Sequence, residues 1–375
     1  MESVNPAFAH RQVSVELAGL EPATSWVRSE ARAIPRGAPA RRIVSCVGNR
    51  PTIKDVAEGA GVSIATVSRA LNDKGDVSDG TRERVLEVAR SVGYSADRAA
   101  RSLVTQKTRL VAVVVGDNAG HRDLSLIFFG KVLAAISRRL AQLGYDPLLL
   151  QPRDAGREHR FDAAVLIGVD DDDPLVADLG SRQVPLVGVD VRCTGGRAVF
   201  VGSDHADGVR LALAHLHALG HRRIAHIAGA VNTVAGSERL NAFRLEAQAL
   251  GLEHSDELLR QGDFSSTSGY RETCALLALS ERPTAIVAAS DLMALAAMQA
   301  IRDVGLQPGP DVAVVGFDDL EAAALVHPPL TTIRQDRQEL GTLAATRAIE
   351  LIDDAEVIPS ATVLPVELIV RGSTS

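Results

Sequence analysis

TIKDVAEGAGVSIATVSRALN, residues 52–72, predicts two short helices joined by a tight turn. Thr52 and Ser63 are the expected N-caps of the first and second helix, because their side-chain oxygens can accept hydrogen bonds from free backbone N–H groups. Gly61 suits the left-handed backbone of the turn, and small Ala57 allows the two helices to approach each other. The segment therefore has the pattern of a helix-turn-helix.

A third amphipathic helix is predicted by VSDGTRERVLEVARSVGY, residues 77–94. Ser78 is its expected N-cap, and Gly93 is expected to end it. The side chains expected to face the first two helices are Val85, Leu86, Val88, Ala89 and Val92. Three packed helices are also compatible with a purely structural unit, so the surrounding sequence decides between the two interpretations.

These motifs and the segments that follow them resemble the LacI/GalR family of bacterial transcription regulators. The resemblance rests on GVSIATVSRALN, VSDGTRERV, GYSADRAARSL and the start of the next domain at LVAVVV, and it extends with gaps to the C-terminus. It implies a sequence-specific DNA-binding regulator, a repressor whose operator affinity is controlled by a small ligand. The divisions it implies are a helix-turn-helix DNA-binding domain at 50–95, a hinge helix and linker at 96–108, and an effector-binding and dimerisation domain at 109–375.

The resemblance also assigns roles to residues that would contact DNA. Arg69 would face base edges and can reach guanine, whereas Ile64 and Ala65 offer apolar contact, for example to a thymine methyl group. The expected phosphate contacts are Thr52, Ser63, Thr66, Ser68 and Asn72. Leu103 would enter the minor groove from the hinge helix and kink a central base step. One such leucine is needed from each of two subunits, so a homodimer and a palindromic double-stranded operator are implied.

Residues 1–49 show no sustained apolar period and contain Pro22, Pro35 and Pro39, so a packed unit is not expected there. The segment is predicted to be a disordered extension or the product of a misassigned start codon. A basic arm that adds phosphate contacts is the alternative, since these residues include six Lys and Arg against four Asp and Glu. The segment lacks the basic start and apolar core of a signal peptide.

Charge is divided unevenly along the 375 residues. Residues 50–108 contain ten Lys and Arg against eight Asp and Glu, whereas residues 109–375 contain 24 against 35. DNA phosphates repel the acidic segment, so only the N-terminal head is expected to touch DNA. The formal net charge of −7 therefore excludes DNA binding by the whole surface but not by the head.

From Arg109 onward, apolar runs alternate with helical stretches, which predicts parallel sheets covered by helices. The expected strands are LVAVVV, YDPLLL, AAVLIGV and VPLVGV, followed by RRIAHIAG, TAIVAAS and DVAVVGF. The expected helices are Gly130–Leu143, Gly208–Leu219, Glu238–Leu250 and Leu292–Val304. This pattern predicts an α/β effector domain of two doubly wound parallel-sheet lobes, similar to periplasmic binding proteins, with a ligand cleft at the carboxyl ends of the strands.

In the family this domain crosses between its lobes three times. Lobe one is accordingly expected at about 109–204 and 334–361, and lobe two at about 205–333 and 362–375. One departure lies between YDPLLL and FDAAVLI, where the ten residues QPRDAGREHR replace a full crossover helix. Either lobe one lacks a helix there or the two strands are joined abnormally.

The ends of the expected strands carry candidate effector contacts, assigned by resemblance to the family's motifs. The candidates are Phe128, Phe129, Asp190, Arg239, Phe264, Asp291 and Asp318. An aromatic face with Arg and Asp beside it suits a sugar, because the ring packs on C–H groups while hydroxyl groups need donors and acceptors. Asp291 precedes a helix, so a capping hydrogen bond is its alternative role. Ser290 occupies a position that is often Asn in sugar-responsive members, and Ala235 replaces a frequent polar residue, so the particular sugar stays open.

Other function classes lack their sequence signatures. The histidines between His205 and His226 do not share one helix face, and no EF-hand spacing follows Asp170, so no metal or other cofactor is expected. No nucleophile, base and orienting group occur together, so no enzyme is expected. No run reaches the roughly 18 apolar residues of a membrane span, and three distant cysteines fit a cytoplasmic protein. An exported sugar carrier, the competing class, would need a secretion signal and no DNA-binding head.

Overall fold

The computed structural model describes residues of two compact units, which divide after Ser95. The described segments are 51–71, 77–94, 107–116, 122–156, 160–170, 173–193, 197–253, 255–353 and 360–375. Within the helix at 122–142, side chains are described from Phe128 onward. The predictions for residues 1–49, for Asn72 and for the hinge residue Leu103 lie outside these segments.

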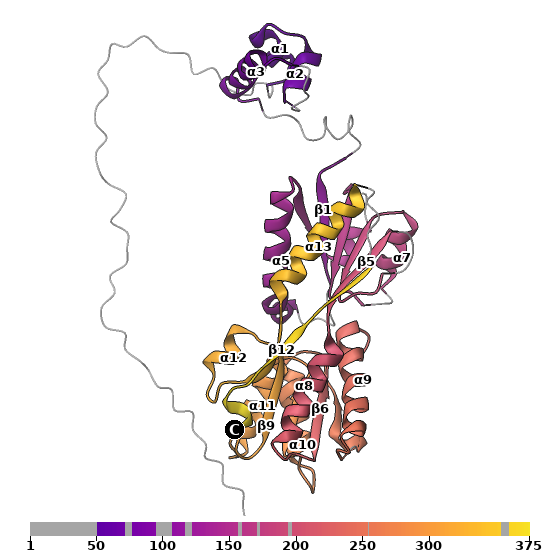
Figure 1. Cartoon of the computed structure of the whole chain (residues 1–375), viewed down its shortest axis with the longest axis vertical. Helices are drawn as coiled ribbons and strands as arrows, with labels where there is room; N and C mark the ends of the chain where they lie inside the picture. The colour runs from indigo at the N-terminus through magenta and orange to yellow at the C-terminus, as the bar shows by residue number, and fades with distance from the viewer. Residues whose placement is uncertain are drawn as a thin grey trace, which may run out of the picture. The chain divides into compact units, whose positions relative to one another are not determined.

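The first unit contains the three predicted helices, α1 (Ile53–Ala60), α2 (Ile64–Leu71) and α3 (Asp79–Ser91) (Figure 1). Gly61 ends α1 with a φ of 64°, in the left-handed region that glycine adopts without steric cost. Val56, Val67 and Val85 are fully buried between the helices. The predicted helix-turn-helix and its third helix are therefore confirmed.

The ends and faces of these helices differ in detail from the prediction. Thr52 is the N-cap of α1, and the Asp55 carboxylate accepts hydrogen bonds from the Thr52 backbone nitrogen at 2.6 Å and from its Oγ1 at 2.8 Å. Ser63 Oγ accepts from the Thr66 backbone nitrogen at 3.1 Å, as expected of the cap of α2. Leu86 and Val92, expected to face the core, are 38% and 37% exposed. The third helix therefore packs through a narrower apolar stripe than predicted.

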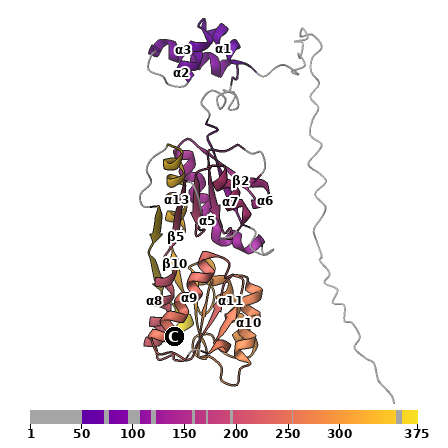
Figure 2. The same cartoon turned by 90° about the vertical axis from the view of Figure 1, so that its right-hand side faces the viewer.

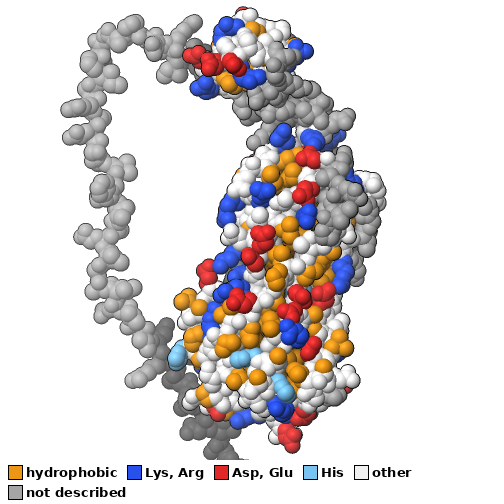
Figure 3. Space-filling view, viewed as in Figure 1, with side chains coloured by type: hydrophobic (Ala, Val, Ile, Leu, Met, Phe, Trp, Pro, Cys, Tyr) orange, Lys and Arg blue, Asp and Glu red, His pale blue; other side chains and the backbone are white. Residues whose placement is uncertain are grey.

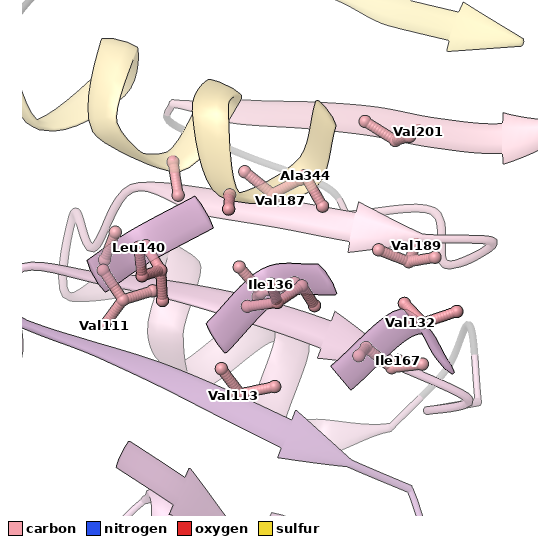
Figure 4. Packing of buried hydrophobic residues seen from close by; sticks show 14 of the residues in the cluster. Val111, Val113, Val132, Ile136, Leu140, Ile167, Val187, Val189, Val201 and Ala344 are labelled. Atoms are coloured by element: carbon pink, nitrogen blue, oxygen red, sulfur yellow. The ribbon is translucent and has the colours of Figure 1, made fainter. Parts of the chain in front are cut away.

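Lobe one of the second unit is a six-stranded sheet in the order β11-β5-β4-β3-β1-β2, with parallel neighbours. Its strands are β1 (Leu110–Val115), β2 (Asp146–Leu150), β3 (Ala163–Ile167), β4 (Leu186–Val189), β5 (Ala198–Ser203) and β11 (Ala361–Leu364). Helices α5 (Arg122–Gln142) and α13 (Arg337–Ile352) pack on one face, where Val111, Ile136 and Ala344 belong to one buried cluster (Figure 4). Helices α6 (Pro152–Ala155) and α7 (Pro174–Ser181) cover the other face.

Lobe two is a six-stranded sheet in the order β12-β10-β9-β8-β6-β7, in which β12 is antiparallel to β10 and the other pairs are parallel. Its strands are β6 (Ile224–Ala228), β7 (Leu259–Gln261), β8 (Ala285–Ala288), β9 (Ala313–Asp318), β10 (Thr331–Gln335) and β12 (Val366–Ile369). One face is covered by α8 (His205–Ala218) and α9 (Val234–Ala249), and the other by α10 (Ser266–Leu277) and α11 (Asp291–Asp303). The short helix α12 (Glu321–Leu325) and the 3-10 turns Asp256–Leu258 and Gly372–Thr374 complete the lobe. The two predicted doubly wound lobes are confirmed, and no helix in the described segments is long and apolar enough to span a membrane.

The chain passes between the lobes after β5, after β10 and between β11 and β12 (Figures 1 and 2). The predicted limits at 334 and 361 each lie a few residues too early, because β10 continues in lobe two to Gln335 and β11 continues in lobe one to Leu364. The first crossing leads directly into α8, so its first residue, His205, lies where the lobes meet.

The short connection between β2 and β3 contains one helical turn, α6, in place of a full crossover helix. β3 still pairs in parallel with β1, so the order of the sheet is retained and the lobe lacks a long helix, the first of the two predicted alternatives. Side chains of β2 alternate between half-buried and exposed, and Leu149 is 64% exposed. β2 is therefore a partly exposed edge strand.

Candidate functional site

One cavity lies between the two lobes of the second unit and is lined by residues from both. Lobe one contributes α5 and the ends of β3 and β4, whereas lobe two contributes α9 and the segments that follow β7, β8 and β9. The lining residues are Phe128, Phe129, Gly168, Val189 and Asp190 from lobe one, and Thr233, Ala235, Arg239, Asp263, Phe264, Ser265, Ser290, Leu292 and Asp318 from lobe two. Of the predicted effector contacts, all except Asp291 therefore surround one cavity.

Three phenylalanines give this cavity its apolar surfaces. Phe128 and Phe129 pack edge to face, with ring centroids 5.2 Å apart. Phe264 has a φ of 68°, and its ring lies so close to Gly229 that a Cβ there would be 2.1 Å from Cζ. Glycine at 229 is therefore what admits the ring of Phe264. These rings offer flat apolar faces of the kind that pack against the C–H groups of a sugar.

Arg239 supplies a buried cation beside the aromatic rings. It is 3% exposed, and its guanidinium carbon lies 3.7 Å from the ring centroid of Phe317 and 5.9 Å from that of Phe264. Its Nη1 donates to the backbone oxygen of Ala289. Burial lowers the pKa of Arg239, and the nearby charge of Asp318 opposes this effect. The guanidinium is therefore held in place at the cavity wall by an aromatic ring and a backbone acceptor.

Asp190 and Arg239 are joined through His205, which was not among the predicted effector contacts. His205 Nε2 lies 3.1 Å from Asp190 Oδ1, while Arg239 Nε and Nη2 lie 3.3 Å and 3.2 Å from His205 Nδ1. Asp190 Oδ1 also accepts from the backbone nitrogen of Ser203 at 3.2 Å. These hydrogen bonds link the end of β4 in lobe one with α9 in lobe two.

Asp318 places a carboxylate at the cavity from the end of β9. Its backbone has a φ of 128°, and its Oδ1 accepts from Gln335 Nε2 at 2.7 Å. Burial raises the pKa of Asp318, whereas the charges of Arg239 and Arg337 lower it. Asp318 is therefore a buried acceptor whose ionised form depends on the cations around it.

Asp291 was predicted as an effector contact, and the structure places it behind the cavity wall instead. It is fully buried, and its carboxylate accepts from the Leu320 backbone nitrogen at 2.7 Å and from Thr332 Oγ1 at 2.5 Å. Nor is Asp291 the cap of α11, because Ser290 Oγ accepts from the Met293 backbone nitrogen at 3.3 Å. Burial and the neighbouring Asp318 raise the pKa of Asp291. The carboxylate of Asp291 thus fixes the segment that follows β9. The position of Asp291 after a strand in the sequence does not reveal these tertiary contacts.

The cavity also contains polar residues that were not predicted as contacts. Asp263 and Ser265 flank Phe264, and Ser265 Oγ donates to Asp263 Oδ1 at 2.5 Å. Thr233 caps α9, since its Oγ1 accepts from the Gly236 backbone nitrogen at 3.1 Å. A sequence signal for all three was available, because each follows a strand and precedes a helix, where ligands bind in α/β folds.

The predicted base-contacting residues form an exposed surface on α2. Ile64 is 45% exposed although it is apolar, and Ala65 and Arg69 are exposed on the same helix. The predicted phosphate contacts Thr52 and Ser63 are exposed, whereas Thr66 and Ser68 are half-buried. Lysine and arginine side chains are visible on the face of this unit drawn in Figure 3. The second helix therefore presents small and apolar side chains at its start and a cation in its last turn.

Comparisons with known sequences match both units. Residues 52–97 match a family model described as bacterial regulatory proteins, lacI family, and residues 213–374 match a periplasmic binding protein-like domain. The chain is 36% identical over 342 residues to the HTH-type transcriptional regulator CelR of Thermobifida fusca, covering 86% of this chain and 98% of that relative. It is 34% identical over 335 residues to the lactose operon repressor of Escherichia coli strain K12, covering 86% and 90% of the two chains.

Solved structures give the same correspondence. The lac repressor dimer bound to operator and the anti-inducer ONPF is similar with a TM-score of 0.77 and 32% identity, over 87% of this chain and 99% of that chain. The complex of the transcriptional regulator CelR with cellobiose is similar with a TM-score of 0.66 and 33% identity, over 86% and 100% of the two chains.

Proposed function

Because this chain belongs to the lacI family of bacterial regulatory proteins, we propose that it is a repressor whose operator affinity is set by a sugar bound between its two lobes. It is a sequence-specific DNA-binding transcriptional regulator with a ligand-responsive effector domain. The identity of the ligand and the roles of individual residues are the parts of the proposal that need experiment.

The lining of the cavity is the observation that carries the sugar proposal. Phe264 offers a flat face for the C–H groups of a sugar ring, while Asp318 accepts hydroxyl hydrogens and Arg239 donates to hydroxyl oxygens. Phe128 and Phe129 close the cavity from the opposite lobe. The complex of CelR with cellobiose supports a sugar ligand for a protein of this architecture.

For DNA, we propose that α2 enters the major groove. Arg69 reads a guanine edge there, and Ile64 and Ala65 make apolar contacts with bases. The hydroxyl groups of Thr52, Ser63, Thr66 and Ser68 contact phosphates, as does Asn72, which lies outside the described segments. Leu103, also outside them, is proposed as the minor-groove wedge.

We further infer a homodimer on a palindromic operator, because two copies of one head read two equivalent half-sites. The lac repressor dimer bound to its operator supports this assembly. Binding to chromosomal DNA places its proposed action in the cytoplasm. The relatives are transcriptional regulators, so the cavity is proposed to bind its sugar as a signal rather than to catalyse a reaction.

The test is selection of duplexes from a random pool by the full chain, repeated with cellobiose, lactose, maltose and glucose in the medium. A palindromic motif should be enriched, its affinity should fall steeply with salt, and at least one sugar should change its recovery. Enrichment of no motif would reject operator binding. An enriched motif that no sugar affects would reject these sugars as effectors.

A further inference from the structure

His205 occupies a buried position between two charged groups that line the cavity from opposite lobes, Asp190 and Arg239. It is 1% exposed and opens α8, immediately after the first crossing between the lobes. Asp190 lies on one side of its ring, at the end of β4 in lobe one, and Arg239 lies on the other, in α9 of lobe two.

The partners of His205 determine its tautomer. A guanidinium group only donates hydrogen bonds, so His205 Nδ1, which lies 3.3 Å from Arg239 Nε and 3.2 Å from Nη2, must be the acceptor. The ring proton is therefore on Nε2 and is donated to Asp190 Oδ1 at 3.1 Å. A ring protonated on both nitrogens would direct an N–H group at the guanidinium, so this arrangement requires neutral His205.

The same contacts limit what a ligand can use. Arg239 has five N–H donors, of which His205 and the backbone oxygen of Ala289 engage Nε, Nη1 and Nη2 once each. One N–H group on each Nη atom remains. A sugar in the cavity can bind these two donors without displacing His205. Asp190 Oδ1 accepts hydrogen bonds from His205 Nε2 and from the backbone nitrogen of Ser203, whereas its Oδ2 accepts none from the described part of the chain.

We propose that His205 is a positioning residue for the effector: as the neutral Nε2–H tautomer, it fixes Arg239 of lobe two to Asp190 of lobe one. A sugar that binds either side chain then senses the relative position of the lobes through the imidazole. This inference rests on the proposed function for its sugar-dependent part only, because the tautomer and the hold on Arg239 exist without ligand.

Two substitutions separate the halves of the link. In His205→Asn, the amide oxygen takes the place of Nδ1 and can accept from Arg239, but the shorter side chain does not reach Asp190. In His205→Gln, the terminal amide takes the place of Nε2 and can donate to Asp190, but no acceptor is left near Arg239. His221→Gln is the matched control, because His221 is hydrogen-bonded to a side chain, Thr284 Oγ1 at 2.9 Å, and does not line the cavity.

The first experiment needs no sugar. The full chain is labelled with ¹⁵N in its histidine and arginine side chains, and long-range ¹H–¹⁵N spectra are recorded at neutral pH, with His205 assigned from its substitution. We expect the Nε2–H tautomer for His205, and an Arg239 Nε–H signal that persists in His205→Asn and His221→Gln but is lost to solvent exchange in His205→Gln. An Nδ1–H tautomer, a doubly protonated ring, or an Arg239 signal that is equal in all variants would overturn the proposal.

The second experiment measures operator binding with and without the panel sugar that has the largest effect. His205→Gln should weaken sugar binding at least tenfold, whereas His205→Asn should keep sugar affinity within about threefold and lose most of the sugar's effect on operator affinity. Equal losses of binding and of coupling in both variants would indicate a merely structural histidine. If no panel sugar acts on the unaltered chain, these four sugars are rejected as effectors, while the spectra still decide whether His205 holds Arg239.

Discussion

Arg337 Nη2 donates a hydrogen bond to the backbone oxygen of Asp319 at 2.9 Å, which joins the first turn of α13 in lobe one to the segment after β9 in lobe two. The guanidinium carbon of Arg337 also lies 5.8 Å from the ring centroid of Phe128, which lines the cavity. Asp319 follows Asp318, which lines the same cavity from the other lobe. Arg337 therefore connects the opposite walls of the cavity through the second crossing of the chain.

Arg337→Met should weaken sugar binding and reduce stability. Methionine retains the apolar length of the side chain but removes the donor to Asp319, and a lost hydrogen bond from a charged donor costs about 1.5–3 kcal/mol. Phe128 loses its cationic neighbour at the same time. Denaturant titration of the full chain and isothermal titration with the active panel sugar would measure both effects.

The control for this substitution is Arg334→Met. Arg334 also binds Asp319, at 2.8 Å through its carboxylate, but its side chain is 48% exposed and it is paired with Glu367 on the surface. Exposed ion pairs contribute about 0–1 kcal/mol, so the control should change stability little and sugar affinity not at all. Equal effects of the two substitutions would show that Asp319, rather than the contact between the lobes, is what matters.

Asp291 should make the effector domain less stable as the pH rises toward neutrality. Burial and Asp318 raise the pKa of Asp291 above the ordinary value of 3.8, so the folded state binds this proton more tightly than the unfolded state does. The stability linked to this proton is complete below the unfolded pKa and is lost as the pH rises through the folded one, over a window of about pH 4 to 7. Asp291→Asn should flatten the dependence of the melting temperature on pH in that window.

Asp319→Asn provides the opposite signature. Burial raises the pKa of Asp319, but hydrogen bonds from Arg371 and Arg334 outweigh it, and the net shift is downward. Its ionised form therefore stabilises the fold above the unfolded pKa, and this contribution is lost as the pH falls through the lowered value. The variant should lose stability near neutral pH and resemble the unaltered chain in acid. Parallel pH profiles for the two variants would contradict these assignments.

The helices and strands with a regular apolar pattern were predicted from the sequence. Elements whose position depends on tertiary contacts were not. The spacing of Gly61 and Val67 was sufficient for the helix-turn-helix, because a left-handed turn and a buried plug leave few alternatives. Strands with continuous apolar runs, such as β3, were equally evident. β5, β7 and the strands at the crossings were not among the predicted strands. β7 has only three residues, and the side chains of β11 alternate between exposed and half-buried, so neither has a continuous buried apolar run.

The candidate site shows the same limit. Motif resemblance located six of the side chains that line the cavity, because strand ends meet at one edge of a parallel sheet. It misplaced Asp291, whose partners Leu320 and Thr332 are far away in sequence, and it passed over His205, whose partners come from both lobes. A buried polar residue is recognised by its partners, and those are known only after folding.

Arg69→Ala should lose discrimination at one symmetric base position of the operator, by about 1–3 kcal/mol per contact. Arg69 is exposed in the last turn of α2, where a guanidinium can reach a base edge. Binding to a full set of single-base operator variants would measure the loss. Arg90→Ala is the control, because Arg90 is an exposed arginine of α3 whose Nε donates to Leu86 O. Equal weakening on every operator would reassign Arg69 to a phosphate contact.

Arg239→Met should abolish the response of operator binding to sugar while keeping the fold. In the unaltered chain the guanidinium carbon of Arg239 lies 3.7 Å from the ring centroid of Phe317. The methionine side chain can still pack on this ring, but it offers a sugar no hydrogen-bond donor. The coupling that is lost should equal the sugar's effect on the unaltered chain, about 1–3 kcal/mol. Titration of a fluorescent operator duplex with increasing sugar would measure it.

Comparison with the unaltered chain at saturating sugar then separates the two modes of control. If the sugar releases the operator, Arg239→Met should bind DNA more tightly than the unaltered chain at saturating sugar. If the sugar is required for binding, the variant should bind DNA more weakly than the unaltered chain at that concentration. Leu103→Ala should weaken specific binding in either case, because a wedge that bends the operator acts on DNA rather than on sugar. An Arg239→Met variant with an unaltered sugar response would exclude Arg239 from the effector site, and an unchanged Leu103→Ala variant would exclude the wedge.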